Sequence, residues 1–73
     1  MPVTLVNVKD VFSHHTPSTE QLAKYQAIRD AAREFAIAVI AHMPVCADQQ
    51  AAVRHVREAM MTANAAIALE GKV

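Results

Sequence analysis

The sequence predicts an all-α protein: an antiparallel hairpin of two long helices, preceded by a short N-terminal helix or arm, and assembled into a homo-oligomer. In two stretches the apolar residues advance in alternating steps of three and four, the spacing of one helix stripe. Pro17 and Pro44 mark where one helix begins and where it must end. Fifteen alanines add high helix propensity. We therefore divide the chain into residues 1–15, the arm or short helix, and residues 16–73, the hairpin.

The apolar side chains of residues 1–15 fit two structures. They suit either a strand or a short helix that packs across the hairpin, and of the two we expect the helix. These side chains are Leu5, Val6, Val8, Val11 and Phe12.

The first long helix is expected at about residues 18–43. Two capping arrangements fit its start. Thr16 can be the N-cap with Pro17 in the first helical position, where the missing N–H does no harm. Alternatively, Ser18 and Gln21 can form a capping box, and the sequence leaves both open. The apolar stripe of this helix consists of Tyr25, Ile28, Ala32, Phe35 and Val39.

The second long helix is expected at about residues 48–70. Pro44 cannot continue the first helix, so the chain turns there and the two helices become antiparallel neighbours. Asp48 is the expected N-cap, with Cys46 as a less conventional choice. Gly71, the one glycine of the chain, lies where a left-handed C-terminal cap belongs. The apolar stripe of this helix consists of Val53, Val56, Met60, Ala63 and Ile67.

Both helices carry more apolar surface than a hairpin can bury. Residues 35–41 and residues 65–69 are apolar on every side of their helices, and such helices are buried on every side. A chain of this length buries only about 60% of its unfolded surface by itself. Cys46 stands alone, so no intrachain disulfide compensates. We therefore expect further copies of the chain to cover the remaining surface.

The composition argues against several classes of protein. Seven basic and seven acidic residues leave no basic footprint for DNA or RNA. No stretch has the roughly 18 unbroken apolar residues of a membrane span. The N-terminus lacks the basic start and long apolar core of a secretory signal. We expect a cytoplasmic location, and the single cysteine agrees with a reducing compartment.

The sequence offers little for catalysis or metal binding. With one glycine, neither a glycine-rich phosphate loop nor a Gly-x-Ser-x-Gly elbow is possible. Cys46 with His42 or His55 could imitate a thiol nucleophile and its base, but a lone cysteine at a helix turn more often caps or packs. No metal-binding motif is present. We expect neither an enzyme nor a bound cofactor.

Two arginine pairs have helical spacing. Arg29 and Arg33 can project from one side of the first helix, and Arg54 and Arg57 are similarly related on the second. A solvated face, paired with nearby acidic side chains, is the more common role of such residues. A phosphate clamp is the alternative, because guanidinium groups pair with phosphate oxygens in bidentate fashion.

Two residues with ring side chains and one asparagine are further candidates for ligand binding. Phe12 and His14 lie just before the first helix, where such rings can fix the chain's entry or stack on a nucleobase. Asn64 lies inside the apolar second helix, where a buried amide must find hydrogen bonds. Setting the register of an oligomer is the usual role of such an asparagine, and contact with a ligand is the alternative.

Three segments together resemble a known family. They are Ser13-His14-His15-Thr16-Pro17, Tyr25-Gln26-Ala27-Ile28-Arg29 and Ala63-Asn64-Ala65-Ala66-Ile67-Ala68. The chain resembles the phage anti-CBASS cyclic-nucleotide sponges, which share their helical-hairpin domain with the anti-Thoeris sponges for cyclic ADP-ribose derivatives. The resemblance runs from about Phe12 to Leu69.

The resemblance implies a phage immune-evasion protein. Such a protein forms hexamers and sequesters cyclic di- or trinucleotides at subunit interfaces, in the host bacterial cytoplasm, without cleaving them. His14 stands where the family has an aromatic residue, commonly tyrosine, and Arg29 matches a basic residue that contacts phosphate. Phe12 is a second candidate for base stacking, and Arg33 is added from helix geometry alone.

Two positions depart from the family pattern. Ala31 stands where some members carry a hydroxyl for cyclic trinucleotides, and Leu69 stands where an arginine can follow. Both differences predict a weakened or absent trinucleotide site. The alternatives to a cyclic-oligonucleotide sponge are a sponge for cyclic ADP-ribose-type signals and a helical adaptor that recognises another protein.

Overall fold

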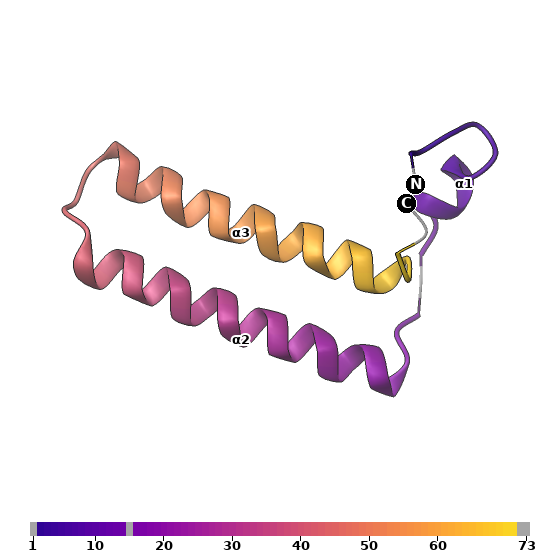
Figure 1. Cartoon of the computed structure of the whole chain (residues 1–73), viewed down its shortest axis with the longest axis horizontal. Helices are drawn as coiled ribbons and strands as arrows, with labels where there is room; N and C mark the ends of the chain where they lie inside the picture. The colour runs from indigo at the N-terminus through magenta and orange to yellow at the C-terminus, as the bar shows by residue number, and fades with distance from the viewer. Residues whose placement is uncertain (1, 15, 72–73) are drawn as a thin grey trace.

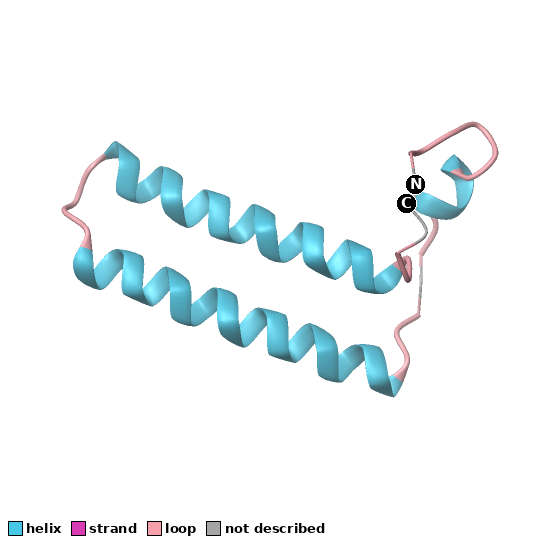
Figure 2. Cartoon of the chain, viewed as in Figure 1, coloured by secondary structure: helices cyan, strands magenta, loops and turns pink. Residues whose placement is uncertain are grey.

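The computed structural model describes residues 2–14 and 16–71. Over that part of the chain the protein is all-helical and has no strand (Figure 2). Its helices are α1 (Val8–Val11), α2 (Thr19–His42) and α3 (Ala47–Ala68). Figure 1 shows α2 and α3 running side by side in opposite directions. The predicted hairpin is confirmed, and its helix bounds lie within one or two residues of the expected ones.

The start of α2 is a capping box. The Ser18 Oγ accepts a hydrogen bond from the Gln21 backbone N–H at 3.1 Å, and the Gln21 Oε1 accepts one from the Ser18 N–H at 3.0 Å. Of the two arrangements that the sequence allowed, the structure has this one, and Thr16 and Pro17 precede the helix. The Gln21 Nε2 also donates to the carbonyl oxygen of Ile67 at 3.1 Å. One amide therefore joins the start of α2 to the end of α3.

The turn between the helices follows from Pro44. Met43 is extended, with φ −94° and ψ 147°, as expected of a residue that precedes proline. Gln49 is only 3% exposed, and its Nε2 donates to the Met43 carbonyl oxygen at 3.3 Å. This hydrogen bond satisfies a carbonyl at the end of α2 and ties the turn to the first turn of α3.

The expected capping by Asp48 is wrong. Cys46 occupies the N-cap of α3 and makes no side-chain hydrogen bond to the helix. Because Cys46 is the last extended residue, helical geometry already begins at Ala47 and Asp48 falls inside the first turn. There its carboxylate lies near the positive end of the helix dipole.

The end of α3 has the two hydrogen bonds of a Schellman motif. The Gly71 N–H donates to the Ala66 carbonyl oxygen at 3.1 Å, and the Glu70 N–H to that of Ile67 at 3.2 Å. Gly71 has φ +73°, which confirms its left-handed conformation. The residue directly after the C-cap is nevertheless Glu70, which also has a positive φ of 55°. A side chain therefore occupies the position where glycine is favoured.

The N-terminal segment contains the expected short helix, but this helix does not pack across the hairpin. In the described part of the chain α1 makes no contact with α2 or α3, and Figure 1 shows it beyond the open end of the hairpin. Leu5 and Val6 are 96% and 94% exposed. The reason is length, since a helix of four residues makes about one turn and presents no apolar stripe.

The hairpin alone has almost no core. Among the described apolar residues only Val39 is buried, with 6% of its surface exposed. Phe35, Ile37 and Ile40 of α2 are all more than half exposed. None of the described helices is long and apolar enough to span a membrane. The apolar surface that the sequence predicted to be buried is thus open in the single chain.

Candidate ligand-binding site

The two long helices form two grooves, one on each side of the line of side chains through which they contact each other. Ala32, Val56 and Met60 belong to both grooves. The arginine groove, of about 190 Å³, adds Arg29, Arg33, Ala36, Val53 and Arg57. The apolar groove, of about 570 Å³, adds Ile28, Ala31, Phe35, Ala52, His55, Ala59 and Ala63. Arg29 and Ala31 lie on opposite sides because two residues span about 200° of a helix.

The arginine groove contains both predicted phosphate-binding residues. Arg33 donates from Nη2 to the Asp30 Oδ1 at 3.1 Å, in a pair whose side chains are 61% and 47% exposed. Such an exposed pair contributes at most about 1 kcal/mol to stability. Arg29 makes no hydrogen bond or ion pair with any described residue. Its guanidinium group is therefore available to a ligand, and that of Arg33 becomes available at small cost.

Phe12 and His14 lie apart from this groove. Both belong to the exposed segment before α2, and the Phe12 side chain is 82% exposed. Arg29 lies about 15 Å further along α2, at 1.5 Å per residue from Thr19. Within one chain the predicted base-stacking residues and the predicted phosphate-binding residues therefore do not meet. His15, the neighbour of His14, lies outside the described residues.

Asn64 has an unsatisfied polar atom. Its Oδ1 is buried and has no hydrogen-bond partner among the described residues. Asn64 lies seven residues, or about two turns, after Arg57, so both face the same side of α3. A buried acceptor without a donor costs about 1–3 kcal/mol. Because this atom is buried within the single chain, a donor from an oligomer contact or from a ligand could reach it only after the Asn64 side chain turns outward.

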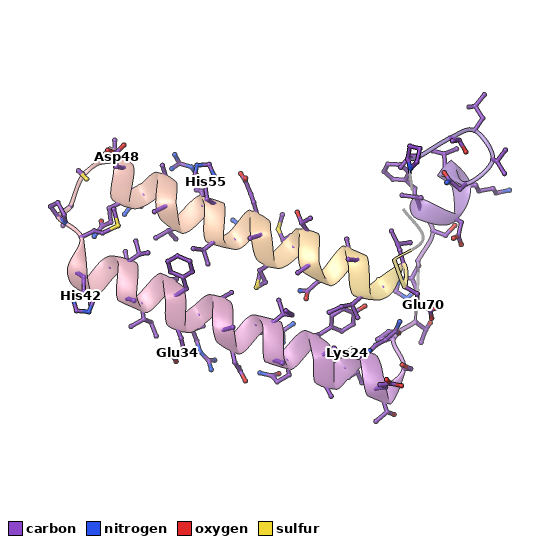
Figure 3. The ribbon with its side chains drawn as sticks, in the orientation of Figure 1. Lys24, Glu34, His42, Asp48, His55 and Glu70 are labelled. Atoms are coloured by element: carbon purple, nitrogen blue, oxygen red, sulfur yellow. The ribbon has the colours of Figure 1, made fainter. Side chains whose placement is uncertain are left out.

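The remaining histidines and the cysteine form no site in the described part of the chain. His55 Nδ1 lies 3.6 Å from the Glu58 Oε2 in a surface pair, and among the described residues no hydrogen bond joins Cys46 to His42 or His55. Figure 3 shows His42 near the turn and His55 further along α3. No group of three or more His, Cys, Asp or Glu residues there could hold a metal ion.

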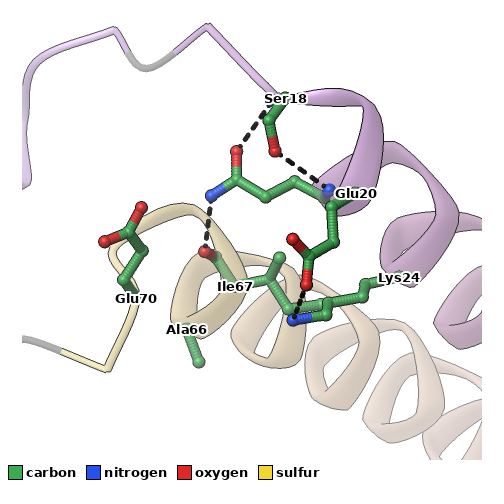
Figure 4. Close-up of a pocket in the computed structure, with 7 residues that line it drawn as sticks. Ser18, Glu20, Lys24, Ala66, Ile67 and Glu70 are labelled. Atoms are coloured by element: carbon green, nitrogen blue, oxygen red, sulfur yellow. Dashed lines mark hydrogen bonds and ion pairs between the residues drawn. The ribbon is translucent and has the colours of Figure 1, made fainter.

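A polar pocket at the open end of the hairpin was not predicted. The pocket has a volume of about 540 Å³ (Figure 4). Its lining includes the N-cap Ser18 and the α2 residues Gln21 and Lys24, and on the other side Ile67 and Glu70. Lys24 Nζ lies 3.5 Å from the Glu20 Oε1, so the one cation is already paired. With two carboxylates in its lining, this pocket is poorly suited to phosphate. The capping-box pattern was the sequence signal that could have located it.

The fold and the grooves define a helical-hairpin protein with one apolar groove and one groove bordered by arginine side chains. The family model described as the Acb2/Tad1 hairpin domain matches residues 4–68, nearly the whole chain. The chain therefore belongs to the Acb2/Tad1 hairpin-domain family of anti-CBASS and anti-Thoeris sponge proteins. Comparisons with curated proteins and with solved structures gave no match. Family membership confirms the resemblance drawn from the sequence.

Proposed function

We propose that this protein binds a cyclic oligonucleotide second messenger of the CBASS type and sequesters it without cleaving it. The observation that carries the proposal is the family match over residues 4–68. Tight binding lowers the free concentration of the messenger by mass action, so that the effector it would activate stays inactive. The protein would act in this way as a phage immune-evasion factor in the host bacterial cytoplasm.

The arginine groove supports the choice of ligand. Arg29 and Arg33 offer two guanidinium groups at one side of α2, and such groups bind phosphate oxygens in bidentate fashion. The groove floor between them is apolar and can accept a base or sugar face. A ligand with several phosphates joined by nucleosides matches both properties.

Assembly into a homo-oligomer, a hexamer by analogy with the family, is part of the proposal. Val39 is the one buried apolar residue of the described chain, so the single hairpin has little to hold it together. Self-association would cover the exposed side chains of Phe35 and Ile40. It would also let Phe12 and His14 of one subunit reach the arginine groove of another and stack on a base.

Two other functions remain alternatives. A cyclic ADP-ribose-type signal of the Thoeris system is the first, since the family contains sponges for both kinds of messenger. A helical adaptor for another protein is the second, because the exposed apolar groove could equally receive a foreign helix. A panel of nucleotides that includes cyclic ADP-ribose distinguishes the two kinds of messenger, and an adaptor would be expected to bind none of them.

The test is calorimetry of the purified protein with cyclic di-AMP, cyclic GMP-AMP, cyclic tri-AMP and cyclic ADP-ribose. We expect a cyclic dinucleotide to bind more tightly than the trinucleotide, because Ala31 and Leu69 lack the family's polar groups. At 100 times its Kd the ligand should stabilise the fold by about 2.7 kcal/mol, seen as a higher Tm. Tightest binding of cyclic ADP-ribose would favour the Thoeris alternative, and no binding of any compound would refute the proposal.

Retention of the intact ligand is tested separately. The protein is incubated with the bound nucleotide and then heat-denatured, and the supernatant is analysed by chromatography. Recovery of the unchanged nucleotide in full is expected of a sponge. Appearance of linear product at the rate of enzyme turnover would show a hydrolase instead.

A further inference from the structure

The N-terminal segment contains an apolar turn that is closed by hydrogen bonds. Leu5 and Val6 lie at the tip of this turn, between Thr4 and Asn7. The Thr4 carbonyl oxygen accepts a hydrogen bond from the Asn7 N–H at 3.2 Å and another from the Val8 N–H at 2.9 Å. The Thr4 N–H donates to the Asn7 Oδ1 at 2.7 Å, and the Val6 N–H donates to the Thr4 Oγ1 at 3.2 Å. Backbone and side-chain hydrogen bonds together thus fix the position of the tip.

The tip of this turn, which we call the apolar turn (residues 4–7), is unusual for an exposed turn. Such positions are dominated by Gly, Pro, Asn, Asp and Ser. Leu5 and Val6 are instead almost completely exposed to solvent. The hairpin of the same chain does not cover them, because α1, which follows the turn directly, lies beyond the open end (Figure 1). Exposed apolar side chains on an ordered element are typical of a docking segment.

The apolar groove has a surface that such a turn can enter. Its volume is about 570 Å³, and its lining is apolar except for His55. Half of the lining residues are alanines, and because alanine ends at Cβ, these positions leave room for side chains from outside. Phe35, which also lines the groove, is 62% exposed. In the single chain this groove therefore lacks a cover.

The total surface of the chain indicates that a second copy supplies the cover. A folded monomer of 7.9 kDa is expected to expose about 4,400 Å². The chain exposes 5664 Å². The excess of about 1,250 Å² is larger than the roughly 800 Å² that each partner buries in a stable interface. Contact with another copy of the chain would bring the exposed surface to the ordinary value.

The turn and the groove of one chain lie apart. The turn lies beyond the open end of the hairpin, where α2 begins at Thr19 (Figure 1). Ile28, the first α2 residue of the groove, is nine residues or about 14 Å further along the helix. The chain enters α2 through Pro17, whose ring fixes φ, and through Ser18, which is extended with φ −78° and ψ 167°. This entry leads the segment away from its own groove, whereas the turn of a second copy is free of that constraint.

We propose that the apolar turn of one copy docks into the apolar groove of a second copy, with Leu5 and Val6 between the alanines of α2 and those of α3. This inference rests on the homo-oligomer of the proposed function and names the segment and the surface that form its interface. Because turn and groove are different surfaces, each chain donates one turn and receives another, and such head-to-tail contacts can close into a ring. Docking also brings Phe12 and His14 of the donor chain to the neighbour's hairpin.

The first test is the mass of Leu5→Asp by light scattering over a range of protein concentrations. Aspartate is favoured in turns, so the turn itself should stay closed. A carboxylate buried in the groove is unpaired, and we expect the oligomer to dissociate at concentrations at least about 100-fold higher than the wild type does. Val45→Asp is the matched control, since it makes the same kind of change at an apolar residue that is 91% exposed and lies at the opposite end of the hairpin. It should dissociate like the wild type.

The second test is disulfide cross-linking, which leaves the interface otherwise intact. The exposed Cys46 is first replaced by serine, and Leu5→Cys is then combined with Ala59→Cys in the groove. Under mild oxidation we expect products at multiples of 7.9 kDa on a non-reducing gel. Leu5→Cys with Met61→Cys is the control, because two residues span about 200° of a helix and place Met61 on the other side of α3. This pair should stay largely uncross-linked.

The outcomes separate this inference from the function on which it rests. Equal cross-linking of the two pairs, or a disulfide within a single chain, would overturn the inference, and so would a wild-type mass for Leu5→Asp. Should Leu5→Asp unfold, the cross-linking result decides. A wild type that is a single chain in solution would also overturn it and leave the groove to a foreign helix. Nucleotide binding is measured by calorimetry on the wild type, so sequestration is confirmed or refuted independently.

Discussion

The two grooves of the hairpin share a floor and differ in their rims. Ala32, Val56 and Met60 contribute to both, so the same helix packing supports each side. The apolar groove is bordered by alanines and the exposed ring of Phe35, whereas three arginine side chains contribute to the lining of the arginine groove. The comparison shows that a hairpin with almost no core of its own presents two incomplete surfaces. We propose that one surface receives another copy of the chain and that the other receives an anion.

Breaking the apolar side should have the largest effect. Phe35→Asp places a carboxylate in the surface that we expect to be covered by another copy, and an unpaired buried charge costs about 3–5 kcal/mol. Light scattering should show a shift from the oligomer to the 7.9 kDa chain. Val45→Asp, at a turn position that is 91% exposed, is the matched control and should keep the oligomer. An unchanged mass for Phe35→Asp would show that this groove is not the interface.

A substitution in the arginine groove should weaken ligand binding and leave the oligomer intact. Arg29→Gln removes a charge-assisted contact to phosphate, which we expect to cost about 1.5–3 kcal/mol of binding free energy. Calorimetry measures the loss, and light scattering on the same sample should give the wild-type mass. Loss of the oligomer in this variant would mean that the two sides are not independent.

A substitution between the two helices should lower the stability of the hairpin, on which both grooves depend. Val39→Ala removes two buried methyl groups from the stripe by which α2 packs on α3, at a cost of about 2 kcal/mol. Chemical denaturation at a fixed protomer concentration measures it, since the stability of an oligomer depends on concentration. The matched control, Val45→Ala, makes the same change at an exposed position and should alter stability by less than about 0.5 kcal/mol.

The smallest expected effect lies outside both grooves. Glu70 has a positive φ of 55°, so Glu70→Gly should stabilise the protein by about 0.5–1 kcal/mol. Denaturation under the same conditions should show the gain, while ligand affinity and oligomer mass stay unchanged. A destabilised variant would indicate that the Glu70 carboxylate makes a contribution which outweighs the backbone strain.

Much of the fold follows from local chemistry and could be predicted. The apolar steps of three and four, together with Pro44, determine both helices and their turn. Local chemistry alone could not choose between Thr16 and Ser18 as the cap, because each would satisfy free amide groups in the first turn of the helix that it starts. The Asp48 cap was wrong since the length of the extended turn, and not the preferred residue type, decides where α3 begins.

The site was less predictable because it depends on contacts between elements. The pair Arg29 and Arg33 could be found from helix spacing, as both lie on one helix. The position of Arg57 opposite them depends on how far α3 is shifted along α2, which no local pattern specifies. The failure of α1 to pack on the hairpin is of the same kind, since it concerns a contact and not a conformation.

The amide of Gln21 has a consequence for how the open end of the hairpin moves. It accepts from the Ser18 N–H and donates to the Ile67 carbonyl, so unwinding the first turn of α2 also removes a partner from the last turn of α3. The two helix ends should therefore fray as one cooperative unit. Hydrogen exchange would then occur at a common rate in both, although 46 residues of chain separate them.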